Sequence, residues 1–213
     1  MFVKDKDSYS KEGQDYFALY INKFKENGTF VEIGSNDAIK DNNSYLLEKK
    51  YNWKGLLVEY DPVYRDSYIR HRTSNFIIQD GTTIDYKSVF ANLNFPNKID
   101  YLQIDLDENN GSTLKALELF DKTIFSNYTF NAITFEHDIY ASNSYDTRLK
   151  SREIFMKNGY ILVFPDVKHS LNQPFEDWYV HHSVGMEFIS SIKTDNSLIW
   201  TDVMEILNEK CMK

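Results

Sequence analysis

The chain has 213 residues, with 32 Asp and Glu against 24 Lys and Arg, which gives a net charge of −8. Its length favours one domain over two, and 42% hydrophobic with 26% charged residues excludes the disordered and fibrous classes. The acidic balance argues against nucleic acid as a partner, because phosphate neutralisation by Lys and Arg supplies much of that affinity.

Apolar, β-branched runs alternate along the chain with segments of helical pattern. Several runs, such as GLLVE and YILVF, are apolar at nearly every position, as in strands that helices cover on both faces. In chain order, the sequence predicts strands at 29–33, 55–59, 75–79, 100–105, 131–136 and 160–164. It predicts helices at 16–28, 44–55, 112–121 and 147–159, and a final helix at 191–210. This alternation indicates βαβ units in a doubly wound α/β sheet.

The end of the predicted sheet differs from its beginning. YILVFPDV and FEDWYVHH, separated by a short loop, predict an antiparallel hairpin. Such an ending is unusual for dinucleotide-binding domains and habitual in class I methyltransferases. We therefore predict a Rossmann-like class I methyltransferase fold, with a mostly parallel seven-stranded sheet and a terminal antiparallel hairpin. One domain is expected over 1–213, with an N-terminal helical segment (1–28), a sheet core (29–182) and a C-terminal helical segment (183–213).

The first strand leads into the turn GSNDAIK. In a doubly wound sheet, ligands bind at the carboxyl ends of the strands. Gly34 lets a ligand approach the backbone closely, and Glu32 holds a carboxylate beside it. The turn lacks the G-x-G-x-x-G pattern that binds pyrophosphate, so an NAD-dependent enzyme is disfavoured. A carboxylate suits the cationic amino-acid group of S-adenosylmethionine (SAM), although a plain strand and turn explains the pattern equally well.

Acids also end the next two strands. Glu59 follows Gly34 at a distance close to the ~20 residues at which an acid accepts the ribose hydroxyls in dinucleotide folds. Asp80 and Gly81 end the third strand, where an acid is placed to reach the amine of an adenine. For Glu59, the alternative is a solvated acid before a turn that contains proline. For Asp80 and Gly81, it is an ordinary Asp-Gly turn.

Four segments together resemble the FkbM family of SAM-dependent methyltransferases. They are YSKEGQDYF, FVEIGSNDAIKDNNSYLLEKKYNWKGLLVEYDP, IDYLQIDLDENNGSTLKALE and ITFEHDIY, in the family's order, and the resemblance runs from about Tyr9 to about His181. It implies O-methyl transfer from SAM to a hydroxyl, most often on a sugar or a glycosylated metabolite. Ala38 replaces the glycine that ends the family's first turn. We expect SAM to contact Glu32, Gly34, Ser35, Asn36, Asn43, Ser44, Glu59, Asp80, Gly81 and Asp105.

Acids and a histidine end the fourth and fifth strands, which are neighbours in this topology. The motifs QIDLDE and FEHD therefore converge on one cleft. Carboxylates that converge repel one another unless they share a cation or a proton, and hard divalent ions suit such a set. The candidate ligands of Mg²⁺ or Mn²⁺ are Asp105, Asp107, Glu136, His137 and Asp138. The alternative is a metal-free cluster that orients SAM.

Methyl transfer to a hydroxyl also needs a group that removes its proton. His137 is the candidate general base, with Asp105 and Asp138 beside it, because it is fixed at the end of a central strand. His181 and His182 on the terminal hairpin are the next candidates.

The sequence thus favours a SAM-dependent O-methyltransferase acting on a hydroxyl of a sugar or glycan. Alternatives are a SAM enzyme for RNA or a small metabolite, and a non-catalytic Rossmann-like binding domain. We expect a carbohydrate partner, and neither nucleic acid nor a membrane. The charged N-terminal segment shows no secretory signal, and the single Cys211 fits a reducing compartment, so we expect the cytoplasm, or the host cytoplasm if the source is viral.

Overall fold

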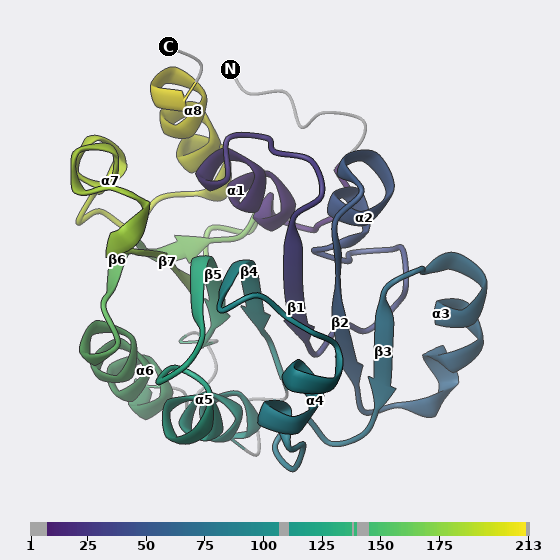
Figure 1. The fold of residues 1–213 in the computed structure, drawn as a ribbon. Helices are drawn as coiled ribbons and strands as arrows, with labels where there is room; N and C mark the ends of the chain where they lie inside the picture. The colour runs from purple at the N-terminus through teal and green to yellow at the C-terminus, as the bar shows by residue number, and fades with distance from the viewer. Residues whose placement is uncertain (1–7, 107–110, 138, 140–144, 212–213) are drawn as a thin grey trace.

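The computed structural model describes residues 8–106, 111–137, 139 and 145–211. Its centre is a seven-stranded sheet with the strand order β3-β2-β1-β4-β5-β7-β6 (Figure 1). The strands are β1 (Thr29–Ile33), β2 (Lys54–Glu59), β3 (Asn75–Ile78), β4 (Lys98–Ile104), β5 (Thr129–Glu136), β6 (Tyr160–Lys168) and β7 (Pro174–His181). Strands β1 to β5 are parallel, and β7 runs antiparallel to both β5 and β6. The predicted mostly parallel sheet with a terminal antiparallel hairpin is confirmed.

Helices pack on both faces of this sheet (Figure 1). One apolar cluster includes side chains of α1 (Gln14–Ile21), α2 (Tyr45–Tyr51), α3 (Arg65–His71), α7 (Met186–Ile192) and α8 (Trp200–Cys211). A second cluster includes side chains of α4 (Tyr86–Asn92), α5 (Ser112–Thr123) and α6 (Tyr145–Lys157). Because strand side chains alternate between faces, β4 contributes to both clusters, with Tyr101 in the first and Leu102 in the second. Burial on two faces explains why these strands are apolar at nearly every position.

The first helix is shorter than the predicted 16–28. Helix α1 ends at Ile21, and Lys23 and Phe24 then take left-handed backbone angles, with φ of 53° and 52°. The Asn22 side chain donates to the carbonyl oxygens of Ala18 and Asp100, which ties the end of the helix to β4. Residues that cap a helix in this way compete with its continuation.

The predicted final helix over 191–210 is wrong in its first part. Helix α7 ends at Ile192 and α8 begins at Trp200, and the segment between them pairs with β6. Thr194 N–H donates to Val163 O at 3.0 Å, and Lys168 N–H donates to Leu198 O at 2.8 Å. These bonds extend the edge of the sheet and take the backbone groups that a helix would use.

Helices α3 and α4 were not expected from the sequence. Each has only seven residues: α3 buries Tyr68 alone, and α4 buries Tyr86 and Phe90, so the apolar pattern of each is too short to mark a helix in the sequence. No helix in the described part of the chain is long and apolar enough to cross a membrane.

Candidate functional site

A cavity of about 1220 Å³ lies at the carboxyl ends of the parallel strands. Its walls include the turn after β1, the ends of β2, β4 and β5, the beginning of β7 and the segment before α1. Crevices outside the carboxyl ends of the strands are where doubly wound sheets bind ligands. Since small-molecule sites usually measure ≈ 300–1,000 Å³, the cavity has room for a cofactor and a second substrate.

The strand register brings the acids of this cavity onto one face of the sheet. Glu32 of β1 is level with Gln103 of β4, which is level with Thr134 of β5. Since side chains alternate between faces, positions two residues further on lie on the same face and nearer the carboxyl edge. Those positions are Asp105, Glu136 and, directly opposite Glu136 on antiparallel β7, Glu176. All four acids, Glu32 among them, line the cavity.

Glu32 is fixed by the segment that enters α2. Its side chain accepts a hydrogen bond from the Asn43 backbone N–H at 2.9 Å and another from the Ser44 hydroxyl. Only 1% of the residue is exposed, and burial raises the pKa of Glu32 to about 7, although Arg72 and both hydrogen bonds oppose this rise. Glu32 can therefore hold or lose a proton near neutral pH.

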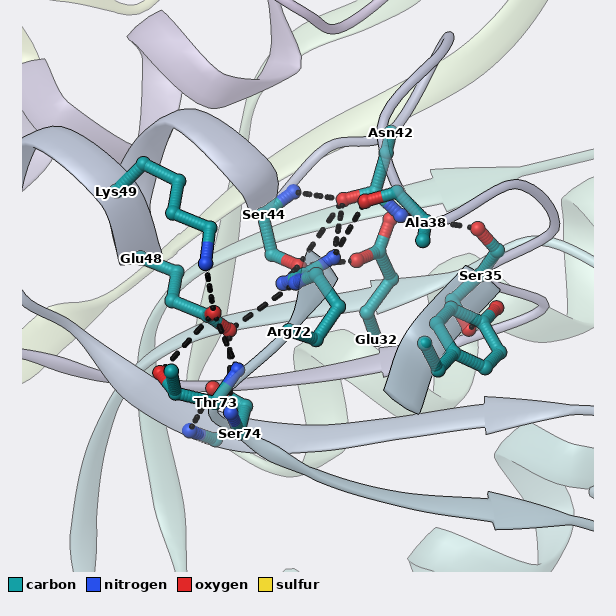
Figure 2. Close-up of polar contacts among 12 residues, drawn as sticks. Glu32, Ser35, Ala38, Asn42, Ser44, Glu48, Lys49, Arg72, Thr73 and Ser74 are labelled. Atoms are coloured by element: carbon teal, nitrogen blue, oxygen red, sulfur yellow. Dashed lines mark hydrogen bonds and ion pairs between the residues drawn. The ribbon is translucent and has the colours of Figure 1, made fainter. Parts of the chain in front are cut away.

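Arg72 ties this acid to the core (Figure 2). Its Nη2 donates to Ser44 Oγ at 2.8 Å and its Nη1 to Asn42 Oδ1 at 2.9 Å, while its Nε donates to Glu48 at 3.0 Å. The side chains of Arg72 and Glu48 are 0% and 2% exposed. Despite burial, Arg72 and the hydrogen bonds of the 73–74 segment hold the pKa of Glu48 at about 2. This network fixes the wall of the cavity that contains Asn43.

Gly34 permits a close backbone approach between β1 and β4. Its φ is +85°, and a Cβ at this position would lie 1.6 Å from Asp105 O. Any other residue would push the turn away from the end of β4. Glycine is thus required here for packing inside the protein, and the turn brings Asn36 to the cavity wall.

Glu59 is oriented by the turns around it. One carboxylate oxygen accepts Asn36 N–H at 2.8 Å and the other accepts Asp61 N–H at 2.9 Å. Each oxygen keeps a lone pair for a further donor, and the residue lines the cavity. The carboxylate is therefore held in place and available to a pair of hydroxyl groups.

Asn43 offers an acceptor that the protein leaves unused. Its Oδ1 is buried and, among the residues that the structure describes, has no hydrogen-bond partner. The residue is 7% exposed and lines the cavity. Buried polar atoms are normally paired, so an unpaired one in a cavity wall is suited to a ligand donor.

Four of the predicted cofactor residues do not line the cavity. Ser35 is buried and bonds Val58 O and the Tyr68 hydroxyl, and Ser44 belongs to the Arg72 network. Asp80 is exposed and accepts two hydrogen bonds from Thr82. The remaining one is Gly81, which is buried against Ile33. The predicted residues that do line the cavity are Glu32, Gly34, Asn36, Asn43, Glu59 and Asp105.

His137 faces away from the cavity. Its neighbour Glu136 lines the cavity, so alternation turns His137 to the other face of the sheet. The ring is fully buried, with Nε2 3.5 Å from Asp166 Oδ1 and 3.6 Å from Asp177 Oδ1. The structure does not bring His137 to the cavity, and a strand-parity argument on FEHD would have found this from the sequence.

The hairpin histidines lie at the other edge of the sheet. His181 ends β7 and His182 follows it directly; because β7 runs antiparallel, both lie at the amino ends of the parallel strands. His182 Nδ1 lies 3.0 Å from Gly159 O. Neither residue lines the cavity.

The described residues include only part of the predicted metal site. Of the five candidate ligands, Asp105 and Glu136 line it, His137 does not, and Asp107 and Asp138 lie outside the described residues. Mg²⁺ usually takes only one or two protein carboxylates and keeps several waters. The divalent ion at Asp105 and Glu136 therefore stays a prediction.

The His137 cluster is an ion-pair network rather than a metal centre. His137, Asp166 and Asp177 have ligand atoms within 4.8 Å of one another. Arg152 donates to both oxygens of Asp177 at 2.6 and 2.7 Å, and Arg148 donates to Asp166 at 2.6 Å. Although burial opposes it, Arg152 holds the pKa of Asp177 well below its usual range. The two arginines neutralise both carboxylates, so the cluster joins α6 to the hairpin.

Several residues of the cavity wall were not expected from the sequence. Tyr60 and Leu171 are 72% and 80% exposed at its rim, and Glu176 lies at its base. Tyr60 directly follows Glu59, so its position next to a predicted ribose ligand was a usable signal. The residues around Leu171 come from the β6–β7 loop, which nothing in the sequence connected to the cavity.

Comparison with known proteins shows the fold. No family model and no curated relative matches this chain. A protein from Clostridium thermocellum described as an rRNA methylase has 11% identity over 84% of this chain and 99% of its own, with a TM-score of 0.52. Aeropyrum pernix fibrillarin with bound SAM has 13% identity over 80% and 74%, with a TM-score of 0.49. An O-methyltransferase from Bacillus cereus in complex with SAH has 12% identity over 83% of each chain, with a TM-score of 0.48.

At these identities, the likeness concerns the fold alone. Together with the strand order, the match to the methylase of Clostridium thermocellum shows that this chain has the fold of class I SAM-dependent methyltransferases.

Proposed function

We propose that this chain is a SAM-dependent O-methyltransferase of the FkbM type, which acts on a hydroxyl of a sugar or glycan. The observation that supports it most is the cavity, in which Glu32, Asn43 and Glu59 face one large space at the carboxyl ends of β1 and β2. The fold also supports the proposal, because it is the fold of known methyltransferases, and one similar structure contains SAM.

The wall residues fit the chemical groups of SAM. The unpaired Asn43 Oδ1 and the Glu32 carboxyl are acceptors for an ammonium group. Glu59, with one N–H already bound at each oxygen, is suited to accept from a ribose diol. The bound cofactor would supply an electrophilic methyl group, and the protein must then orient an acceptor oxygen and take its proton.

The charge of the wall favours a neutral acceptor over RNA. The described lining contains eight acids against the two lysines Lys11 and Lys40. A polyanion entering this space would lose the phosphate neutralisation on which RNA affinity depends. A sugar carries no such penalty, and exposed Tyr60 offers it a face to pack against.

Calorimetry with SAM tests the cofactor assignment. We expect SAM to bind, NAD not to bind, and Glu59→Ala to weaken SAM binding about tenfold or more, because it removes a charge-assisted hydrogen bond worth ~1.5–3 kcal/mol. Asp66→Ala, an exposed acid of α3 outside the cavity, is the matched control and should bind SAM as the wild type does. Unchanged affinity in Glu59→Ala would reject the role of Glu59.

Methyl-labelled SAM tests the acceptor class. A panel of free monosaccharides and glycosides should receive label, and a matched pool of structured RNA should not. Loss of transfer in EDTA that Mg²⁺ or Mn²⁺ restores would show that a divalent ion takes part, and unchanged transfer in EDTA would reject it. Label in RNA alone would reject the sugar assignment.

A further inference from the structure

Glu176 is held by hydrogen bonds from two different elements. One carboxylate oxygen accepts from Gln14 Nε2 at 3.0 Å and the other from Trp178 Nε1 at 2.5 Å. The residue is 1% exposed and lines the cavity. Two donors from different elements thus fix the direction of its remaining lone pairs, as a proton acceptor requires.

The groups that face Glu176 are neutral or acidic. Gln14 of α1, Gln103 of β4 and Trp178 of β7 approach it, Asp105 of β4 adds a negative charge, and Glu136 of β5 is directly opposite. Lys11, Glu12 and His169 belong to the neighbouring segments of the cavity wall, before α1 and between β6 and β7. The contacts that hold Glu176 therefore come from amide and indole groups, and no arginine is among the described residues of the cavity wall.

These surroundings favour the protonated form of the Glu176 carboxyl. Burial raises the pKa of Glu176 to about 8, and the negative charge of Asp105 acts in the same direction. A positive charge that enters the cavity would reverse this effect, since a nearby cation favours the carboxylate.

We propose that Glu176 accepts the proton of the acceptor hydroxyl, and that it keeps a proton of its own until a cation enters the cavity. The inference rests on the proposed function, because SAM is then the cation and carries a positive charge on its sulfonium. The protein would thereby form its base only when the methyl donor is present.

The proton and electron balance of the step is simple. The Glu176 carboxyl first loses its proton to solvent. The acceptor O–H bond then breaks and its proton moves to a Glu176 carboxylate oxygen. The electron pair of the acceptor oxygen forms the bond to the methyl carbon, and the electron pair of the broken sulfur–methyl bond stays on sulfur. The neutral sulfur no longer favours the carboxylate, so Glu176 ends the cycle protonated.

Proton release on binding tests the inference without any acceptor. Calorimetry at pH 7 in two buffers of different ionisation enthalpy counts the protons released by SAM and by S-adenosylhomocysteine, which lacks the sulfonium charge. We expect SAM to release about 0.5 proton or more beyond S-adenosylhomocysteine, because a carboxyl with a pKa near 8 is mostly protonated at pH 7.

Two variants assign the proton to a residue. Glu176→Gln should abolish the difference between the two ligands, whereas Glu136→Gln, an acid of the same wall and the same length, should retain it. Trp178→Phe keeps the Glu176 carboxyl but removes one hydrogen-bond donor to its charged form. The proton release on SAM binding should therefore occur at a higher pH than in the wild type. This third variant decides the question if Glu176→Gln does not fold.

The outcomes separate this inference from the proposed function. Failure of SAM to bind the wild type rejects the proposed function. SAM binding with equal proton release for both ligands, or with the difference retained in Glu176→Gln, overturns the role of Glu176 alone. For any sugar that the wild type methylates, kcat of Glu176→Gln should fall about 10²-fold or more while the Kd for SAM changes little.

Discussion

Removal of Arg72 should destabilise the protein strongly, because this residue joins α3 to the wall of the cavity. In Arg72→Met, the Glu48 carboxylate loses its principal cation while it stays buried, with 2% of its side chain exposed. Breaking a buried ion pair by removing one partner costs about 3–5 kcal/mol. Glu48 would still accept from Thr73 N–H at 2.7 Å and its hydroxyl at 3.1 Å, so we expect the lower end, about 3 kcal/mol. That is a large part of the ~5–15 kcal/mol that stabilises a typical domain.

Urea unfolding followed by circular dichroism measures this cost. Arg70→Ala, an exposed arginine in the last turn of α3, which ends directly before Arg72, is the matched control and should stay within about 0.5 kcal/mol of the wild type. The double variant Arg72→Met with Glu48→Gln removes both charges of the ion pair. It should recover part of the lost stability, because no unpaired carboxylate is then buried. A loss below about 1 kcal/mol in Arg72→Met alone would refute the view that this network holds the cavity wall.

Two further predictions concern the turn after β1 and the His137 cluster. Gly34→Ala should lower the free energy of unfolding by more than about 3 kcal/mol, because its Cβ would lie 1.6 Å from Asp105 O. Gly111→Ala is also at positive φ but has nothing within 4 Å of its Cβ, so it should cost only ~1–2 kcal/mol. Equal losses in urea unfolding would show that backbone strain, rather than the clash with Asp105, determines the cost. His137→Asn should lower the free energy of unfolding by ~1–3 kcal/mol, because the ring lies between Asp166 and Asp177. The calorimetric Kd for SAM should stay unchanged, since the ring is not in the cavity wall. A tenfold weaker binding of SAM would contradict this placement.

The sequence predicted those features that depend on short-range patterns. Apolar runs located the strands, and the pair YILVFPDV and FEDWYVHH located the antiparallel end of the sheet. Acids at strand ends, such as Glu32 and Glu59, were predicted to face the ligand space because parallel strands end at one edge, and both line the cavity. These inferences need only the periodicity of each element and the topology of the sheet.

The features that escaped prediction depend on which face a side chain takes or on distant partners. His137 was placed in the cavity because its position at the end of β5 was considered without its parity relative to Glu136. Glu48 and Arg72 lie 24 positions apart and meet only after α2 and α3 pack on the same face. Glu176 entered no sequence argument, since its position in the cavity follows from the antiparallel pairing of β5 with β7.

Two carboxyls of the cavity have raised pKa values, and they should make the stability of the protein fall as the pH rises. Glu32 and Glu176 have pKa values of about 7 and about 8 in the folded chain, against 4.5 for an ordinary Glu. Between pH 4.5 and 8 the folded state therefore binds more protons than the unfolded state, and stability is lost as these protons leave. His181 acts in the opposite direction, because burial lowers its pKa from 6.5 to about 4, but only below pH 6.5.

The window from pH 6.5 to 8 excludes the effect of His181, and the variant Glu176→Gln separates Glu176 from other buried acids such as Asp15, whose pKa burial also raises. There, Glu176 should contribute a fall of about 1.5 kcal/mol and Glu32 about half of that. Urea unfolding should show this slope in the wild type, and Glu176→Gln should remove more than half of it while becoming the more stable protein at pH 8. A wild-type stability that rises through this window would contradict the raised pKa values of these two buried carboxyls. Retention of such acids at a cost in stability is expected where their proton serves the reaction.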